Sequence, residues 1–169
     1  PFLTASPVGA GAYDLQTIIG PSAPVVRNDE LYFYYTGIKQ YAFVGSGNDP
    51  SYEDYVPDAG AICLAVLRRD GFISLDADGS EGQLTTRPYT LPGGRLFVNV
   101  GMRKQGQLRV EALDRNGEVL AASAPMTRDQ RRGEVVWERG SLAKLKGQVI
   151  RLRFSLRHGS LYSYWYQDS

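Results

Sequence analysis

Two runs of β-forming residues dominate the first half of the chain. Leu31 to Thr36 reads Leu-Tyr-Phe-Tyr-Tyr-Thr, and this density of aromatic side chains after a polar turn predicts a strand. Ala61 to Leu67 is continuously apolar and short for a helix, so we expect a strand that is buried on both faces. Residues 45–60, which lie between the two runs, are rich in Gly, Pro, Asp and Tyr and predict a long loop.

Alternating apolar and polar residues predict two hairpins in the second half. The first runs from Gln107 to Ala124 and turns at Asp114-Arg115-Asn116-Gly117, a type I turn with a bulge at the glycine. If Asp114 pairs with Glu118, the apolar residues of both arms lie on one face of the hairpin. These residues are Leu108, Val110 and Ala112 on the first arm and Leu120, Ala122 and Ala124 on the second.

The second predicted hairpin runs from Val149 to Gln167 and turns at His158-Gly159, with Arg157 opposite Ser160. One face of this hairpin holds Leu152, Phe154, Leu156, Leu161, Ser163 and Trp165. The other face places Arg151, Arg153 and Ser155 opposite Tyr166, Tyr164 and Tyr162. We therefore expect a ladder in which guanidinium groups stack on tyrosine rings, each pair adding ~0.2–1 kcal/mol.

Helix signals are confined to one short segment. Ser141 to Gly147 offers a serine N-cap and a glycine C-cap, which is enough for one or two turns. Elsewhere, short strand patterns alternate with Gly and Pro turns. The predicted fold is therefore all-β, an antiparallel β-sandwich of the jelly-roll-like kind that is preceded by further strands.

Composition places the 169 residues among ordinary globular chains, with 43% hydrophobic and 22% charged residues. No apolar run approaches the ~20 residues of a membrane span, so we expect no membrane partner. The single cysteine, Cys63, excludes an internal disulfide and a multi-cysteine zinc site. We also expect the chain to use no cofactor. The net charge of +1 conceals a split between −7 in residues 1–84 and +8 in residues 85–169, which indicates two pieces of opposite charge.

Two segments suggest special chemistry but have simpler explanations. Asp76 to Glu81 has the carboxylate spacing of a calcium loop but lacks the later ligands, and Asp and Gly serve turns for backbone reasons alone. We therefore expect no metal site there. His158, the single histidine, fits a Ser/His/Asp triad with Ser160 or Ser163 and a distant aspartate. In an exposed turn, however, it is an ordinary imidazole, and this interpretation is favoured.

Paired carboxylates, which glycoside hydrolysis requires, are available in the first half but fall in turns or in the long loop. They are Asp14, Glu30, Asp49, Glu53, Asp54 and Asp58. We interpret them as solvated loop residues. The arginines of the second half raise the alternative of a nucleic-acid site, but they alternate with Glu or Tyr in a chain of almost no net charge. A salt-bridged surface or an interface is the better interpretation, and we expect no nucleic-acid partner.

Aromatic residues crowd the first 60 positions. Tyrosine faces beside Asp and Asn suit stacking on sugar rings, with hydrogen bonds to the hydroxyl groups, although a plain sheet core explains the same residues. The residues that we expect at a carbohydrate contact are Tyr13, Asp14, Gln16, Ser22, Tyr34, Tyr52 and Tyr55.

Longer segments resemble one family. Residues 13–36 carry an aromatic-Asp entry, a Pro-Ser-x-Pro strand and the run DELYFYY, and they resemble a blade of a five-bladed β-propeller glycosidase of the β-fructosidase and arabinanase type. Residues 60–91 are similar to the segment that ends such propellers, and residues 95–166 are similar to the C-terminal β-sandwich that follows it. The resemblance implies propeller-blade-like strands over 1–75 and a sandwich over 76–169. It also places Gln16, Ile18 and Ser22 toward the propeller axis, where they would at most contact a sugar.

The catalytic carboxylates of that family lie in earlier blades, and no residue here matches its catalytic motifs. The resemblance therefore implies a non-catalytic, C-terminal part of a glycoside-hydrolase-like protein with a role in folding, oligomerisation or carbohydrate contact. The chain starts at Pro1 rather than Met, which we interpret as processing or as a piece of a longer protein. A free-standing carbohydrate-binding β-sandwich and a small independent hydrolase remain the alternatives.

Partners and location follow from the same resemblance. A single blade exposes apolar faces and strand edges, so we expect a homo-oligomer with a Tyr-rich interface. The 169 residues contain no secretory signal pattern, yet the family favours a secreted or periplasmic location.

Overall fold

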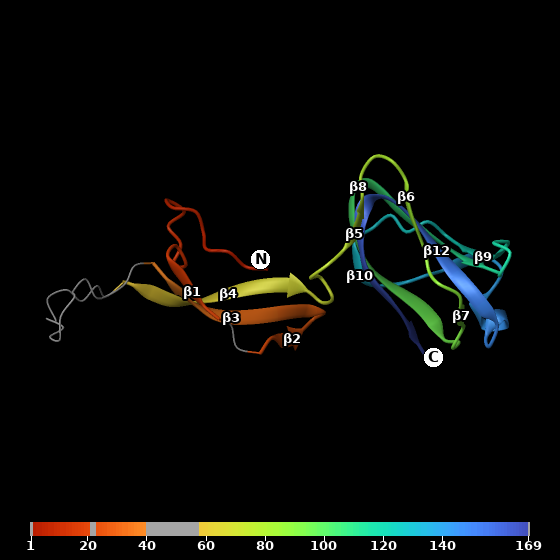
Figure 1. The fold of residues 1–169 in the computed structure, drawn as a ribbon, viewed down its shortest axis with the longest axis horizontal. Coiled ribbons are helices and arrows are strands. Elements are labelled where there is room, and N and C mark those ends of the chain that lie inside the picture. The colour runs from red at the N-terminus through yellow and green to blue at the C-terminus, as the bar shows by residue number, and fades with distance from the viewer. Residues whose placement is uncertain (1, 21–22, 40–57, 169) are drawn as a thin grey trace, which may run out of the picture. The chain divides into compact units, whose positions relative to one another are not determined.

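A computed structural model describes residues 2–20, 23–39 and 58–168 of the chain, and these residues form an all-β fold (Figure 1). They divide into two compact units, with unit 1 ending at Arg69 and unit 2 beginning at Asp70. The boundary expected after residue 75 falls instead inside a strand of unit 2, because Leu75 pairs with Leu161 there. The long loop expected over 45–60 lies mostly outside the described residues.

Unit 1 is an antiparallel sheet built around β3, Glu30–Ile38. β4, Gly60–Arg68, pairs with β3 along its whole length, whereas β1, Thr17–Ile19, and β2, Val25–Arg27, pair with its two ends. A strand has only two edges, so β1 and β2 share the edge opposite β4 and the sheet is three strands wide. The strands predicted from Leu31 and from Ala61 are therefore confirmed.

The two faces of this sheet differ sharply. On one face Phe33 and Tyr35 are buried, and the Phe2 ring meets the Phe33 ring edge-on at 5.0 Å. The opposite face, which we call the open face, carries large apolar side chains in the exposed class. They are Ile19, Val25, Tyr34, Ile62, Leu64 and Val66, which lie on one face because cross-strand partners point to the same side. The expectation that 61–67 is buried on both faces is wrong, since Ile62 is 74% exposed.

Unit 2 contains one large antiparallel sheet with two 19-residue strands, β8, Arg95–Leu113, and β12, Val149–Gln167, paired along their length. One edge of β12 also pairs with the short strands β5, β6 and β7, which are Leu75–Ala77, Gly82–Thr85 and Tyr89–Thr90. The free edge of β8 pairs with β9, Val119–Ser123, and with β10, Gln130–Glu134. β11, Trp137–Arg139, pairs with the other edge of β9. Figure 1 shows the long strands curving around a shared interior.

The hairpin predicted at His158-Gly159 is wrong. β12 continues through these residues, and β8 accommodates the bend by looping out four residues, 103–106, between Met102, opposite Gly159, and Gln107, opposite Arg157. His158 has a φ of 46°, so it takes the left-handed conformation of a bulge rather than that of a tight hairpin turn. Leu152, Phe154, Leu156 and Leu161 nevertheless face the core together.

The expected arginine–tyrosine ladder is also wrong, because it depended on that hairpin. Arg153 lies opposite Glu111 on β8, and its Nη2 is 2.6 Å from the Glu111 carboxylate. Arg151 donates a 2.7 Å hydrogen bond to the carbonyl oxygen of Arg115. Tyr164 and Tyr166 lie farther along β12, opposite Val98 and Leu96.

The turn at Asp114 is confirmed, but the register beyond it differs from the expectation. The Asp114 backbone N–H donates to the Glu118 carbonyl at 2.9 Å, and Gly117 has a φ of 90°. A bulge then shifts the pairing, so that Ala112 faces Ala121. As a result Ala121 and Ser123 are buried, rather than Leu120, Ala122 and Ala124. The Ser123 hydroxyl accepts a 2.9 Å hydrogen bond from the buried N–H of Val110, which satisfies that group beside the irregular pairing.

The core of unit 2 is aliphatic. Fully buried side chains come from both long strands, including Val98, Leu108, Val110, Leu152 and Phe154. The short helix expected over 141–147 is a single 3-10 turn, Leu142–Leu145, that buries Leu142 against this core. The described residues thus form two antiparallel sheets, one in each unit, and they include no helix that is long and apolar enough to cross a membrane.

Candidate functional site

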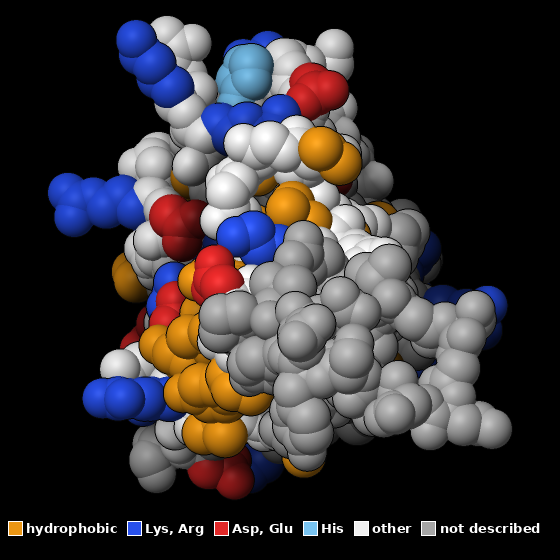
Figure 2. Space-filling view, turned by 90° about the vertical axis from the view of Figure 1, so that its left-hand side faces the viewer, with side chains coloured by type: hydrophobic (Ala, Val, Ile, Leu, Met, Phe, Trp, Pro, Cys, Tyr) orange, Lys and Arg blue, Asp and Glu red, His pale blue; other side chains and the backbone are white. Residues whose placement is uncertain are grey.

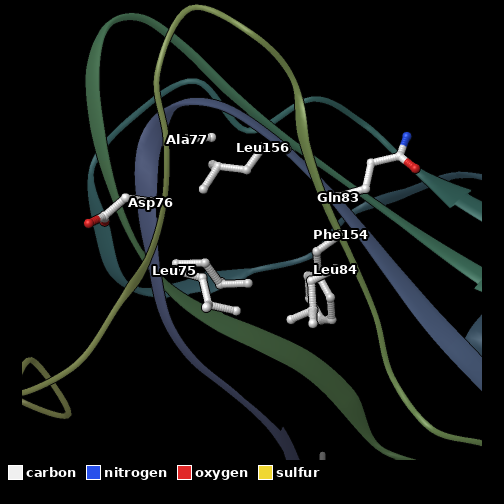
Figure 3. Close-up of a pocket in the computed structure, with 9 residues that line it drawn as sticks. Leu75, Asp76, Ala77, Gln83, Leu84, Phe154 and Leu156 are labelled. Carbon is white, nitrogen blue, oxygen red and sulfur yellow. The ribbon is translucent and has the colours of Figure 1, made fainter.

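A hollow of about 260 Å³ opens under the arch that connects β5 to β6 in unit 2 (Figure 3). The arch forms because β5 and β6 pair with β12 on either side of its bend. Apolar side chains line the hollow: Leu75, Ala77, Leu84, Phe154, Leu156 and Leu161. Phe154 and Leu156 belong to the core and are 1% and 5% exposed, so the hollow reaches directly to the hydrophobic interior.

The polar residues of the hollow lie at its rim. Figure 3 shows the side chains of Asp76 and Gln83 pointing away from the enclosed space. Hydrogen bonds from Ser160 and Ser74 hold the pKa of Asp76 below its ordinary value, so this carboxylate stays ionised near neutral pH. An apolar hollow with no titratable side chain directed into it suits the binding of an apolar group rather than acid–base chemistry.

The carboxylates of the Asp76–Glu81 turn have separate partners. Asp78 pairs with Arg103 at 2.6 Å, Asp76 accepts a 2.9 Å hydrogen bond from Ser74, and Glu81 accepts one from Gln83 at 3.1 Å. Across residues 2–20, 23–39 and 58–168, no cluster of three or more metal-ligating side chains occurs.

His158 lies in the bulge of β12, where its backbone N–H donates to the Asp78 carbonyl at 2.8 Å. The hydroxyl groups that were candidate nucleophiles bond to carboxylates instead: Ser163 donates to Asp70 at 3.1 Å, and Ser160 donates to Asp76. These pairs differ from the order Ser–His–Asp that a triad requires.

The structure distributes the predicted carbohydrate contacts over different parts of unit 1. Ser22, Tyr52 and Tyr55 lie outside the described residues. Gln16 is exposed, and its backbone N–H donates to the Ile38 carbonyl at 2.9 Å at the end of β3. Tyr34 lies on the open face, whereas Tyr35, the partner of Asp14, lies on the other face of the same strand.

Asp14 is a buried carboxylate that supports the sheet. It is 5% exposed and accepts a 2.8 Å hydrogen bond from the Tyr35 hydroxyl. Hydrogen bonds from Ser6 and Tyr35 lower the pKa of Asp14. Desolvation, with the Asp14 carboxylate adding to it, raises the pKa of Tyr35 to about 12. Asp14 therefore anchors the N-terminal segment to β3.

Tyr13 points to a second, exposed cluster. Its hydroxyl donates to Asp58 at 2.7 Å, and the Lys39 ammonium lies 3.2 Å from the same carboxylate and 5.5 Å from the centre of the tyrosine ring. The Tyr13 hydrogen bond lowers the pKa of Asp58 and in turn raises that of Tyr13. Glu30 likewise accepts a hydrogen bond from Tyr32 at 2.9 Å, so the described carboxylate candidates of unit 1 each bond to a tyrosine.

An aromatic pair on the outer surface of unit 2 was not predicted. Phe97 and Trp165 are cross-strand neighbours on β8 and β12 and stack at 5.8 Å with an interplanar angle of 15°. Arg95 lies 5.5 Å over the Phe97 ring, and Arg132 lies 5.6 Å over that of Trp165. Because Arg95 and Phe97 are two residues apart in one strand, the sequence alone predicts that they share a face. The contact with Trp165 could be predicted only by knowing that β12 pairs with β8.

Comparison of the chain with family descriptions, with curated proteins and with solved structures found no match in any of the three.

Proposed function

We propose that this chain is a non-catalytic part of a glycoside-hydrolase-like protein, in which unit 1 packs against a neighbouring β-sheet and unit 2 is an accessory module that contacts carbohydrate. The observation that carries the proposal is the open face of unit 1. Ile62, Leu64 and Val66 on β4 are 74%, 46% and 49% exposed although this strand pairs with β3 along its whole length. Figure 2 shows hydrophobic side chains, coloured orange, that gather at the molecular surface.

The area of the open face gives an upper limit for the free energy that its burial would contribute. A sheet three strands wide and nine residues long covers roughly 400 Å², from a rise of ~3.3 Å per residue and a strand spacing of ~4.8 Å. Burying that area contributes at most about 10 kcal/mol at ~25 cal/mol per Å². A patch of roughly 400 Å² matches the largest apolar patch of a typical monomer, which is often a functional surface.

A neighbouring sheet of the same protein fits this face better than a second copy of the chain. Two copies joined through their open faces would bury roughly 800 Å² in total, less than the ~1,200 Å² of a stable, specific interface. A covalently linked sheet avoids the association cost of at least ~4 kcal/mol. The open face is also mostly aliphatic, whereas the expected homo-oligomer called for a Tyr-rich interface. The homo-oligomer is therefore the second candidate.

The other two alternatives receive less support. A free-standing sugar-binding module of the kind expected would present coplanar tyrosines along one groove, but Tyr34 and Tyr35 lie on opposite faces of β3, and Tyr13 belongs to the exposed cluster with Lys39. An independent hydrolase needs carboxylates of unequal pKa that face a common substrate. Asp14 and Asp58 instead bond to separate tyrosines and both have lowered pKa values.

The open face can be tested with one charge substitution and a matched control. Leu64→Lys places an ammonium group in the centre of the face, while Ser80→Lys adds the same charge to an exposed turn of unit 2. We expect the wild type to bind a hydrophobic dye such as anilinonaphthalene sulfonate, Leu64→Lys to bind several-fold less, and Ser80→Lys to bind as the wild type does. We also expect light scattering to give a monomer mass at micromolar concentration.

Two results would contradict the proposal. If Leu64→Lys binds the dye as well as the wild type does, the open face is not the apolar surface that we describe. If the wild type has a dimer mass that Leu64→Lys abolishes, the face pairs with a second copy, and the homo-oligomer replaces the linked sheet.

A further inference from the structure

A second hollow in unit 2, of about 300 Å³, combines charged, amide, hydroxyl and apolar side chains. It is lined by the segment that leads from β9 into β10 and on toward β11, and its side chains include Met126, Thr127, Arg128, Gln130, Glu134 and Val136. Its volume lies at the lower end of the ~300–1,000 Å³ range of ligand pockets, so it suits one ring-sized group.

Backbone hydrogen bonds tie this segment to the core at both ends. Met126 and Leu108 exchange two bonds of 2.9 Å, and Val135 donates to the Leu96 carbonyl at 2.9 Å. The Ala124 N–H donates to the Val136 carbonyl at 2.8 Å, which closes the loop on itself. The walls of the hollow are therefore held by β8 rather than by loop contacts alone, and a held frame lowers the entropic cost of binding.

Gly133 provides room for the side chains of this hollow. A Cβ at this position would lie 2.3 Å from Gln130 Oε1 and 2.6 Å from Met126 Cε. Its backbone is outside the left-handed region, so glycine is not required there for conformation. The absent side chain lets the Gln130 amide and the Met126 thioether lie over the backbone of β10.

The chemistry of the lining identifies a class of ligand. Arg128 offers hydrogen-bond donors, Glu134 offers acceptors, and Gln130 and Thr127 offer both. The charges of Arg128 and Glu134 cancel, which disfavours a strongly charged ligand. Val136 is 62% exposed and gives the hollow an apolar wall. A neutral sugar ring matches this set, because it presents hydroxyl groups at its edge and C–H groups on its face.

We propose that this hollow is a binding site for a single ring of a neutral saccharide. This site rests on the carbohydrate contact proposed above for unit 2, and it gives that contact a location and a ligand class. Glu134 and Arg128 recognise the hydroxyl groups, and Val136 contacts the apolar face of the ring. Glu134 also accepts a 3.0 Å hydrogen bond from Arg95, which fixes its carboxylate beside the hollow.

The test is an NMR titration of the ¹⁵N-labelled full chain with neutral fructo-oligosaccharides and arabino-oligosaccharides, and separately with acidic oligogalacturonides. Concentrations of up to ~10 mM would saturate a site with a Kd near ~1 mM. We expect a neutral oligosaccharide to shift amide signals within residues 124–136. Glu134→Gln and Arg128→Gln should each weaken binding about 10-fold, a loss of ~1.4 kcal/mol. The matched substitutions Glu138→Gln and Arg139→Gln, on exposed residues of β11, should leave binding unchanged.

The inference is overturned if no neutral saccharide shifts these signals, if the shifts lie elsewhere, or if the β11 substitutions weaken binding as much as those in the hollow. Tighter binding of oligogalacturonides would overturn the assignment to a neutral ligand. Because the open face is tested by dye binding and by mass, failure here with the Leu64→Lys result intact would reject the saccharide site and leave the sheet-packing role of unit 1 standing.

Discussion

Filling the apolar hollow under the β5–β6 arch should stabilise unit 2. Ala77 is 8% exposed and its side chain points into the hollow of about 260 Å³ (Figure 3). Ala77→Leu adds three carbon atoms, worth ~0.8 kcal/mol each when buried, and loses ~0.5–1 kcal/mol of rotamer entropy. The expected gain in the free energy of unfolding is about 1.5–2 kcal/mol. A packed core would instead lose ~1–3 kcal/mol on the same change, so the sign of the effect is diagnostic.

Urea denaturation followed by tryptophan fluorescence measures this effect in the right part of the chain. The two tryptophans, Trp137 and Trp165, both belong to unit 2. With an m-value of ~2 kcal/mol/M, the midpoint should rise by about 1 M in Ala77→Leu. Ala112→Leu, at a fully buried position of β8, is the matched control and should lower the midpoint. A lower midpoint in both variants would refute the open hollow.

Three further outcomes follow from the described contacts. Trp165→Ala should lower the free energy of unfolding of unit 2 by about 1–2 kcal/mol in circular dichroism melts, since it removes a half-buried ring that stacks on Phe97. Gly140→Ala should cost more stability than Gly147→Ala in the same assay, because both glycines have a positive φ but only a Cβ at 140 would lie 2.4 Å from a carbonyl oxygen. Burial favours the protonated Tyr35 hydroxyl and raises its pKa from 10 to about 12 in the folded state. Its contribution to the free energy of unfolding should be complete below pH 10 and should be lost as pH rises through about 12. Tyr35→Phe should remove that part of the alkaline loss of stability in urea titrations repeated over a range of pH.

Local patterns predicted elements well where a strand or turn depends on its own residues. The run from Leu31 and the turn at Asp114 are present because aromatic density and the Asn-Gly pair act locally. The same reasoning failed at His158-Gly159, since a polar residue followed by glycine also suits a bulge inside a strand. Which of the two forms is decided by β8, which loops out opposite His158, and no feature of the local sequence reveals that partner.

The candidate sites depended even more on long-range pairing. Tyr34 and Tyr35 are adjacent, but the sheet sends one to the open face and the other to Asp14, so a count of aromatic residues did not identify a site. Gly133 also shows this dependence on long-range pairing. It makes room for the Gln130 and Met126 side chains, which come together only when β10 pairs with β8. The apolar residues from Ala61 to Leu67 indicated that both faces of this strand favour burial. Within the described residues, Ile62 on one of these faces remains exposed.

The most direct test of the central claim, that unit 1 packs against a neighbouring sheet of a glycoside-hydrolase-like protein, is the coding DNA immediately upstream of the Pro1 codon. We predict an open reading frame that continues in phase through further blade-like strand patterns and carries the catalytic Asp and Glu residues of the β-propeller glycosidases that the sequence resembles. A start codon directly before Pro1 would contradict the claim and would shift the assignment toward a free-standing module.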